Sequence, residues 1–191
     1  MDGVLPVALD LYNYDTDRDT SPGLLILKGG SGPNEGDPAK HQHWLSPALT
    51  AATVVEGTAT VKLWCGTAGF DLALGGVVSA YLRDCDGSSC VELGGGTLSE
   101  SLWQHGSPNW TLKTLMFPVG PYTVAPGHSL ELVVVVEPTS PSDMWFAYDT
   151  NDLKSRVTVP TSAASATGSG AIVSGLVKRW VAQLGARLLF A

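Results

Sequence analysis

Three aspartates at alternate positions form the densest cluster of potential metal ligands in the sequence. They are Asp15, Asp17 and Asp19 of "YDTDRDT". Alternate carboxylates in a loop can converge on calcium, which takes about six to eight oxygen ligands. An EF-hand would need glycine and glutamate where this loop has Thr20 and Ile26. The spacing therefore leaves two interpretations open, a weak structural calcium site or a solvated acidic turn.

A second oxygen-rich loop, "YDTND", contains Asp149, Asn151 and Asp152 and is a candidate neighbour for the first. Asp84 and Asp86 flank a cysteine in "RDCDG", where short acidic side chains are typical turn formers. We expect both of these aspartates to serve the turn rather than a site.

Two histidines, His41 and His43, lie two residues apart in "HQH". On a strand this spacing places both side chains on one face. A transition metal would need a third ligand, and only the fold could bring His105 or His128 close enough. We interpret the two residues as a loop histidine pair.

The stretch "GHSLE", residues 127–131, partly matches the nucleophile elbow of serine hydrolases. The match fails at Glu131, where the elbow has glycine, and an all-β context lacks the strand-to-helix turn that exposes the serine. We expect a strand to begin here after the turn "APG". No paired acid and base or nucleophile constellation is apparent, so the sequence predicts no catalytic residue and no enzyme.

Cys85 and Cys90 enclose the four residues "DGSS". If these residues form the turn of a hairpin, the two cysteines lie opposite each other within disulfide range. A disulfide in an exported domain and two free thiols beside a turn are both open. Cys65 is left over and fits a small buried apolar position.

Five of the six tryptophans divide into two groups by their surroundings, and the sixth, Trp180, belongs to the C-terminal segment. Trp44, Trp103 and Trp110 lie near polar loops, where an exposed ring could stack on a sugar. Trp64 and Trp145 lie within strand patterns, and we expect them in the core.

Short β-type segments separated by turn signals must position these residues. Val61 and Leu63 alternate with polar neighbours in "TATVKLW", and Val78, Ala80 and Leu82 do so in "VSAYLRD". Such a period of two predicts half-buried antiparallel strands, and the continuous "LVVVV" (132–136) predicts a central strand covered on both faces. We expect about eight or nine strands in a sandwich or barrel, with "TAATVVEG" and "TATVKLWCG" as separate strands.

The C-terminal segment differs from the rest of the chain in amino-acid composition and in charge. Residues 1–160 contain 8 Lys and Arg and all 18 Asp and Glu, a balance of −10, whereas residues 161–191 contain 3 basic residues and no acid. Residues 161–170 are small and polar, typical of a flexible linker. Residues 171–191 predict a basic amphipathic helix whose apolar stripe is Val173, Leu176, Val177, Trp180, Val181, Leu184 and Leu188, flanked by Lys178, Arg179 and Arg187.

The order of motifs from Trp44 to Val159 carries a resemblance. "WLSPAL", "EGTATVKLW", "VVSAYLRDCDG", "YTVAPGHSLELVVVV" and "WFAYDTNDLKSRVTV" follow one another. This order resembles the jelly-roll β-sandwich modules of bacterial extracellular proteins. It is more loosely similar to the C-terminal jelly roll of the X-Pro dipeptidyl-peptidase and cocaine-esterase family. The resemblance implies a jelly roll and an accessory or binding role, and it transfers no catalytic residue. We expect the β-sandwich domain to span residues 1–160.

These observations combine into one functional expectation. An acidic body argues against nucleic-acid binding, and a basic amphipathic end favours an anionic membrane surface or a protein partner. The other interpretation of this end is a terminal helix packed on the domain's own sandwich. We expect a non-enzymatic accessory or structural subunit that docks through residues 171–191, and the alternative is a carbohydrate-binding or adhesive module. The opening "MDGVLPVALD" lacks the features of a signal peptide. This leaves a cytosolic chain or a mature form without its leader, and we expect an extracytoplasmic protein, periplasmic or at the cell surface and in association with a membrane.

Overall fold

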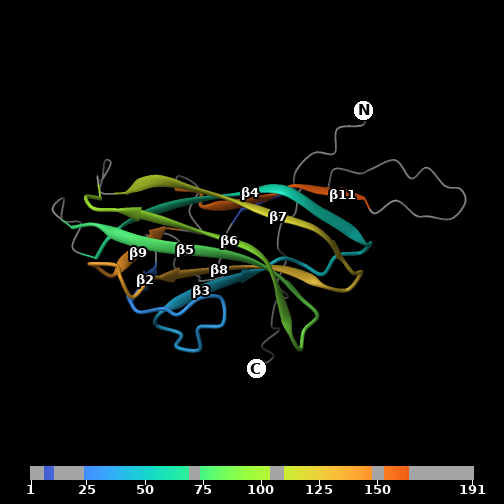
Figure 1. The fold of residues 1–191 in the computed structure, drawn as a ribbon, viewed down its shortest axis with the longest axis horizontal. Helices are drawn as coiled ribbons and strands as arrows, with labels where there is room; N and C mark the ends of the chain where they lie inside the picture. Colours follow the sequence, from blue (N-terminus) through green and yellow to red (C-terminus); the bar gives the residue numbers. More distant parts are fainter. Residues whose placement is uncertain (1–6, 11–23, 69–73, 104–109, 148–152, 164–191) are drawn as a thin grey trace, which may run out of the picture.

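The computed structural model describes residues 7–10, 24–68, 74–103, 110–147 and 153–163. All regular elements in these ranges are β-strands, arranged in two antiparallel sheets (Figure 1). The sequence-based expectation of an all-β sandwich is therefore confirmed. Within the same ranges, no helix is long and apolar enough to span a bilayer. The helix predicted for residues 171–191 and the linker at 161–170 lie outside the described part, apart from Thr161–Ala163.

The first sheet, sheet A, is organised around one long strand, β4 (Thr53–Thr67). Strand β7 (Thr111–Val124) pairs along one edge of β4 over most of its length. The opposite edge pairs in turn with β11 (Thr161–Ala163), β10 (Arg156–Val159) and β9 (Met144–Ala147). Strands β1 (Val7–Asp10) and β2 (Leu24–Ile26) extend the sheet beyond β10 and β9.

The second sheet, sheet B, has four strands in the order β3-β8-β5-β6. They are β3 (His41–Leu45), β8 (Ser129–Val136), β5 (Gly76–Cys85) and β6 (Cys90–Glu100). Strand β8 is central, and every residue from Leu130 to Val136 is buried. This confirms the prediction from "LVVVV". It also confirms that "GHSLE" leads into a strand, because β8 begins at Ser129.

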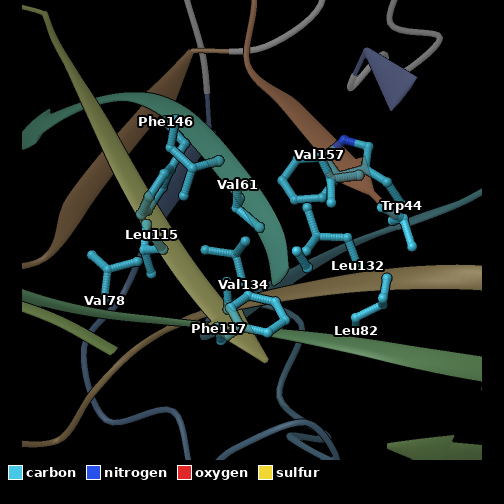
Figure 2. Packing of buried hydrophobic residues seen from close by; sticks show 14 of the residues in the cluster. Trp44, Val61, Val78, Leu82, Leu115, Phe117, Leu132, Val134, Phe146 and Val157 are labelled. Atoms are coloured by element: carbon cyan, nitrogen blue, oxygen red, sulfur yellow. The ribbon is translucent and has the colours of Figure 1, made fainter. Parts of the chain in front are cut away.

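Side chains from the facing sides of the two sheets form the hydrophobic core (Figure 2). The alternation predicted in β4 holds, because Val61 and Leu63 are buried while Lys62 is exposed. The alternation in β5 is less strict, since Ser79 is also buried and its hydroxyl is hydrogen-bonded to that of Thr97. Each large side chain removed from water contributes about 1.5–3 kcal/mol, so this layer supplies the main stabilisation.

A run of three glycines in β6 lets one edge of sheet B approach sheet A. A Cβ on Gly94 would lie 2.4 Å from the carbonyl oxygen of Pro118 in β7, and one on Gly96 would lie 3.1 Å from the Phe117 ring. The glycine between them, Gly95, lies beneath the ring of Tyr81 on the other face. Glycine is needed here because the backbones and rings occupy the space of a side chain.

The structure corrects one strand boundary. The sequence around Glu56-Gly57 predicts a break between two strands, but β4 runs through it as one strand. The register against β7 shifts between Val55 and Gly57, and Gly57 has a φ of 127°. The glycine marks a β-bulge rather than a turn, which the sequence signal alone does not distinguish.

Candidate functional site

The buried carboxylates of the described sandwich, those of Asp84 and Glu131, lie near one end of sheet B. Arg83 and Asp84 are neighbours at the end of β5, and Glu131 lies in β8 opposite Arg83. Because successive strand residues point to opposite faces, Arg83 and Glu131 share the outer face while Asp84 points between the sheets. One sheet end thus carries two separate carboxylate clusters.

The inner cluster is built on Asp84, whose side chain is 3% exposed. The Tyr122 hydroxyl donates to Asp84 Oδ2 at 3.0 Å, and His128 Nδ1 lies 2.9 Å from Oδ1. The hydrogen bond to the carboxylate favours the neutral phenol and so raises the pKa of Tyr122, with burial adding to the effect. Since an ionised carboxylate only accepts, the proton of neutral His128 is held on Nδ1.

The outer cluster is built on Glu131, whose side chain is 6% exposed. His43 Nδ1 lies 2.7 Å from Oε1, and Arg83 Nη1 lies 3.2 Å from Oε2. The same Arg83 nitrogen donates to the carbonyl oxygen of Pro33 at 2.6 Å. Both oxygens of this buried carboxylate therefore have a partner, as a buried charge requires.

A disulfide lies beside the outer cluster. Cys85 and Cys90 are paired in register, with an S–S distance of 2.04 Å and a Cα–Cα distance of 4.1 Å. Together with Glu131 they are the one group of three or more potential metal ligands found among the described residues. The two sulfurs are bonded to each other, so no thiolate is available to a cation here. Cys65 is buried and free, and burial raises the pKa of its thiol.

The two aspartates of "RDCDG" have different roles. Asp86 is a turn former as expected, because its carboxylate accepts hydrogen bonds from the backbone of Ser88 and Ser89, which lowers its pKa. Asp84 was expected to do the same, and that expectation is wrong. It lies in β5 and forms the buried centre of the inner cluster.

The tryptophan assignment from the sequence is reversed in the structure. Trp44, Trp103 and Trp110 were the candidates for exposed stacking, but all three are buried, at 9%, 0% and 5% exposure. Trp64 and Trp145 were expected in the core, and both are only partly buried. The reason is register, since both lie on the outward-pointing positions of β4 and β9.

The histidine pair lies on a strand rather than in a loop. His41 and His43 are the first and third residues of β3, on its outer face with Glu131. His128 belongs to the inner cluster, on the other face of the sheet. Several other candidates lie outside the described residues: Asp15, Asp17, Asp19, His105, Asp149, Asn151, Asp152, and the stripe and basic flank of 171–191.

Sequence reasoning missed the three charged residues that organise both clusters. Each lies inside a strand, Arg83 and Asp84 at the end of β5 and Glu131 between Leu130 and Leu132 of β8, and a buried charge must find a partner. That was the available signal, but the partners, Tyr122, His128 and His43, come from distant segments. Only the strand register brings them together.

The chemistry open to the two clusters follows from their hydrogen bonds. In the described part, the rings of His43 and His128 are bonded to carboxylates and not to a hydroxyl or thiol that could act as a nucleophile. Both carboxylates are held by two partners each. The hydrogen bonds and ion pairs of the two clusters fix this end of the sheet.

No protein-family model matches the sequence, and no curated protein gives a significant match. Solved structures share the fold. A CocE/NonD family hydrolase from Staphylococcus aureus has a TM-score of 0.55 at 12% identity, over 82% of this chain and 36% of its own. An alpha-amino acid ester hydrolase has a TM-score of 0.55 at 11% identity, over 72% of this chain and 28% of its own.

An aminopeptidase from a marine sediment Thaumarchaeota archaeon has a TM-score of 0.54 at 11% identity, over 67% of this chain and 27% of its own. The chain thus spans between 27% and 36% of the length of these proteins. The loose resemblance to the cocaine-esterase family is therefore confirmed at the level of the β-sandwich fold.

Proposed function

We propose that this chain is a non-enzymatic accessory subunit, a jelly-roll sandwich that docks on a larger assembly or a membrane surface through residues 171–191. The observation that carries the proposal is the contrast between an acidic body and a C-terminal segment with three basic residues, no acid and one regular apolar stripe. Burying that stripe would stabilise a docked state by up to about 10 kcal/mol before ordering costs are subtracted. Near anionic lipid each basic residue adds about 1 kcal/mol.

Two features of the sandwich support a non-catalytic role. Its buried carboxylates are satisfied by protein partners, and its fold matches only part of much larger hydrolases. The disulfide supports an extracytoplasmic location, because such bonds persist in oxidising compartments. A calcium ion at Asp15, Asp17 and Asp19 remains part of the proposal, and calcium should then raise the melting temperature by mass action.

The docking proposal is tested by charging the stripe. Trp180→Asp with Leu184→Asp should release the full-length protein from co-purifying chains or from vesicles that contain anionic lipid. The melting temperature of the sandwich should not change, because its core is elsewhere. Ser174→Asp with Gln183→Asp, off the stripe, is the matched control and should weaken binding far less. Unfolding of the sandwich by the stripe variant would assign the segment to the domain's own core and end the proposal.

The alternative is a carbohydrate-binding or adhesive module. What favours it is the partial exposure of Trp64 and Trp145 on the outer side of sheet A, since aromatic faces stack on sugars. Glycan binding that is lost in Trp64→Ala and kept in Trp44→Phe would support a carbohydrate-binding module over an accessory subunit.

A further inference from the structure

Two imidazole rings lie side by side on β3, the edge strand of sheet B. His41 and His43 are two residues apart and so share a face, where they lie opposite Val135 and Val133 of β8. Their ring centroids are 5.7 Å apart and the ring planes are inclined by 70°. The side chain of His43 is 51% exposed, so the pair can be reached from solvent.

The hydrogen bonds fix the same tautomer in both neutral rings. His41 Nδ1 lies 2.9 Å from the carbonyl oxygen of Asp37, and a carbonyl oxygen only accepts. His43 Nδ1 lies 2.7 Å from Glu131 Oε1, and an ionised carboxylate only accepts. Each Nδ1 therefore carries the proton, and each Nε2 keeps a free lone pair. Within the described residues neither Nε2 has a hydrogen-bond partner.

We propose that His41 and His43 bind a first-row transition-metal cation, Cu²⁺ or Zn²⁺, through their two Nε2 atoms. Imidazole nitrogen is a preferred ligand of both cations. Metal-binding histidines usually donate their other N–H to a carboxylate or carbonyl oxygen, which orients the ring and raises its basicity. Both histidines have that second contact. Glu131 is in turn held by Arg83, so the carboxylate behind His43 is itself fixed.

The spacing of the rings suits one shared cation. With metal–nitrogen distances of about 2.0–2.1 Å, two imidazoles on one cation place their centroids roughly 4.5–5.2 Å apart. The observed separation of 5.7 Å is longer than this range, so the two rings must move closer together when they share a cation. His128 lies on the other face of the sheet, so the third ligand that such a cation needs would come from water or from a donor atom of a bound molecule, and the site is an open one.

Metal titration of the untagged full-length protein tests the site. Isothermal titration with CuCl₂, and separately with ZnCl₂, should show one cation per chain with an affinity that falls at least about tenfold in His41→Ala and in His43→Ala. The electron paramagnetic resonance spectrum of the Cu²⁺ form should show coupling to two imidazole nitrogens. His41→Ala is the safer variant for folding, because it gives up only a bond to a loop carbonyl.

His128 provides a matched control, because it is a single carboxylate-bound histidine rather than one of a pair. His128 is also tied to a carboxylate through Nδ1 but lies on the other face of the sheet, so His128→Ala should bind the cation as the unchanged protein does. Glu131→Gln, checked for folding by its melting curve, should weaken binding by about 10- to 100-fold through the ring of His43. If His41→Ala with His43→Ala binds the cation as tightly as the unchanged protein, the inference is wrong.

Discussion

The outer faces of the two sheets differ in what covers them. On sheet B, Val133 and Val135 point outward yet are only 2% and 0% exposed. On sheet A, the outward-pointing Leu112 and Met116 of β7 are 41% and 65% exposed. The same kind of side chain is thus buried on one outer face and open on the other.

The cover on sheet B is the segment between β2 and β3, drawn in blue beside β3 in Figure 1. Gly29 and Gly30 donate backbone hydrogen bonds to the carbonyl oxygen of Val136, and Arg83 holds the carbonyl of Pro33. The comparison shows that a sheet face can be buried without a helix or a third sheet, by a Gly- and Pro-rich segment that stays close to the strands.

The largest expected effect contrasts the two faces directly. Val135→Asp should destabilise the fold by about 4–5 kcal/mol or more, because it buries a charge without a partner under the covering segment. Met116→Asp, on the open face, should cost no more than about 1 kcal/mol. Chemical denaturation of both variants measures the difference. Similar losses in the two variants would mean that residues 27–40 do not cover sheet B in solution.

A smaller effect is expected from the charges on the two faces. Arg83→Met leaves the buried carboxylate of Glu131 with His43 alone and removes the bond to Pro33, so we expect a loss of about 3 kcal/mol. Lys62 is exposed on the outer side of β4, and Lys62→Met should change stability by no more than about 0.5 kcal/mol. Equal stability of the two variants would show that the Arg83–Glu131 pair contributes little.

The contact between cover and sheet can be tested with two glycines of the same segment. A Cβ on Gly30 would lie 2.9 Å from both Val135 Cβ and the carbonyl oxygen of Lys40, whereas one on Gly36 meets nothing within 4 Å. Gly30→Ala should therefore cost about 1–3 kcal/mol by overpacking. Gly36→Ala should be neutral or slightly stabilising. A neutral Gly30→Ala would indicate that the segment lifts off the sheet easily.

Sequence reasoning reached the architecture but not the partners of individual side chains. The alternation around Val61 and the continuous run at 132–136 predicted the strands and the doubly covered centre, because both depend on local pattern. The pattern could not say what covers Val135, since the cover comes from residues about 100 positions earlier. It also placed Trp64 and Trp145 in the core, because a tryptophan within a strand has no local mark of which face it takes.

The candidate site shows the same limit. The pairing of Cys85 with Cys90 was one of two open readings, and both cysteines lie in one hairpin. The inner and outer clusters depend instead on β5 pairing with β8, and on Tyr122 reaching across from the other sheet. Asp84 was assigned to the turn because the turn residues 86–89 follow it closely in the sequence, although Asp84 itself lies in β5.

The smallest expected effect is on the pH dependence of stability, and it again differs between the two outer faces. Glu35 in the covering segment accepts hydrogen bonds from the backbone of Asp37 and from the backbone and hydroxyl of Ser31. These bonds lower the pKa of Glu35 from 4.5 to about 2. Because the pKa of the folded state is depressed, the stabilisation is complete above about pH 4.5 and is lost as the pH falls toward about 2.

Carboxyl carbon NMR should accordingly show Glu35 titrating near pH 2, with the amides of Ser31 and Asp37 shifting over the same range. The amide of Met116 on the open face should not follow that titration, because it has no contact with the segment. Glu35→Gln should remove the shared step while leaving the rest of the pH profile intact. Titration of Glu35 near its ordinary pKa would show that the turn from Ser31 to Asp37 is not held by this carboxylate, and that sheet B keeps its cover by the Gly30 and Arg83 contacts alone.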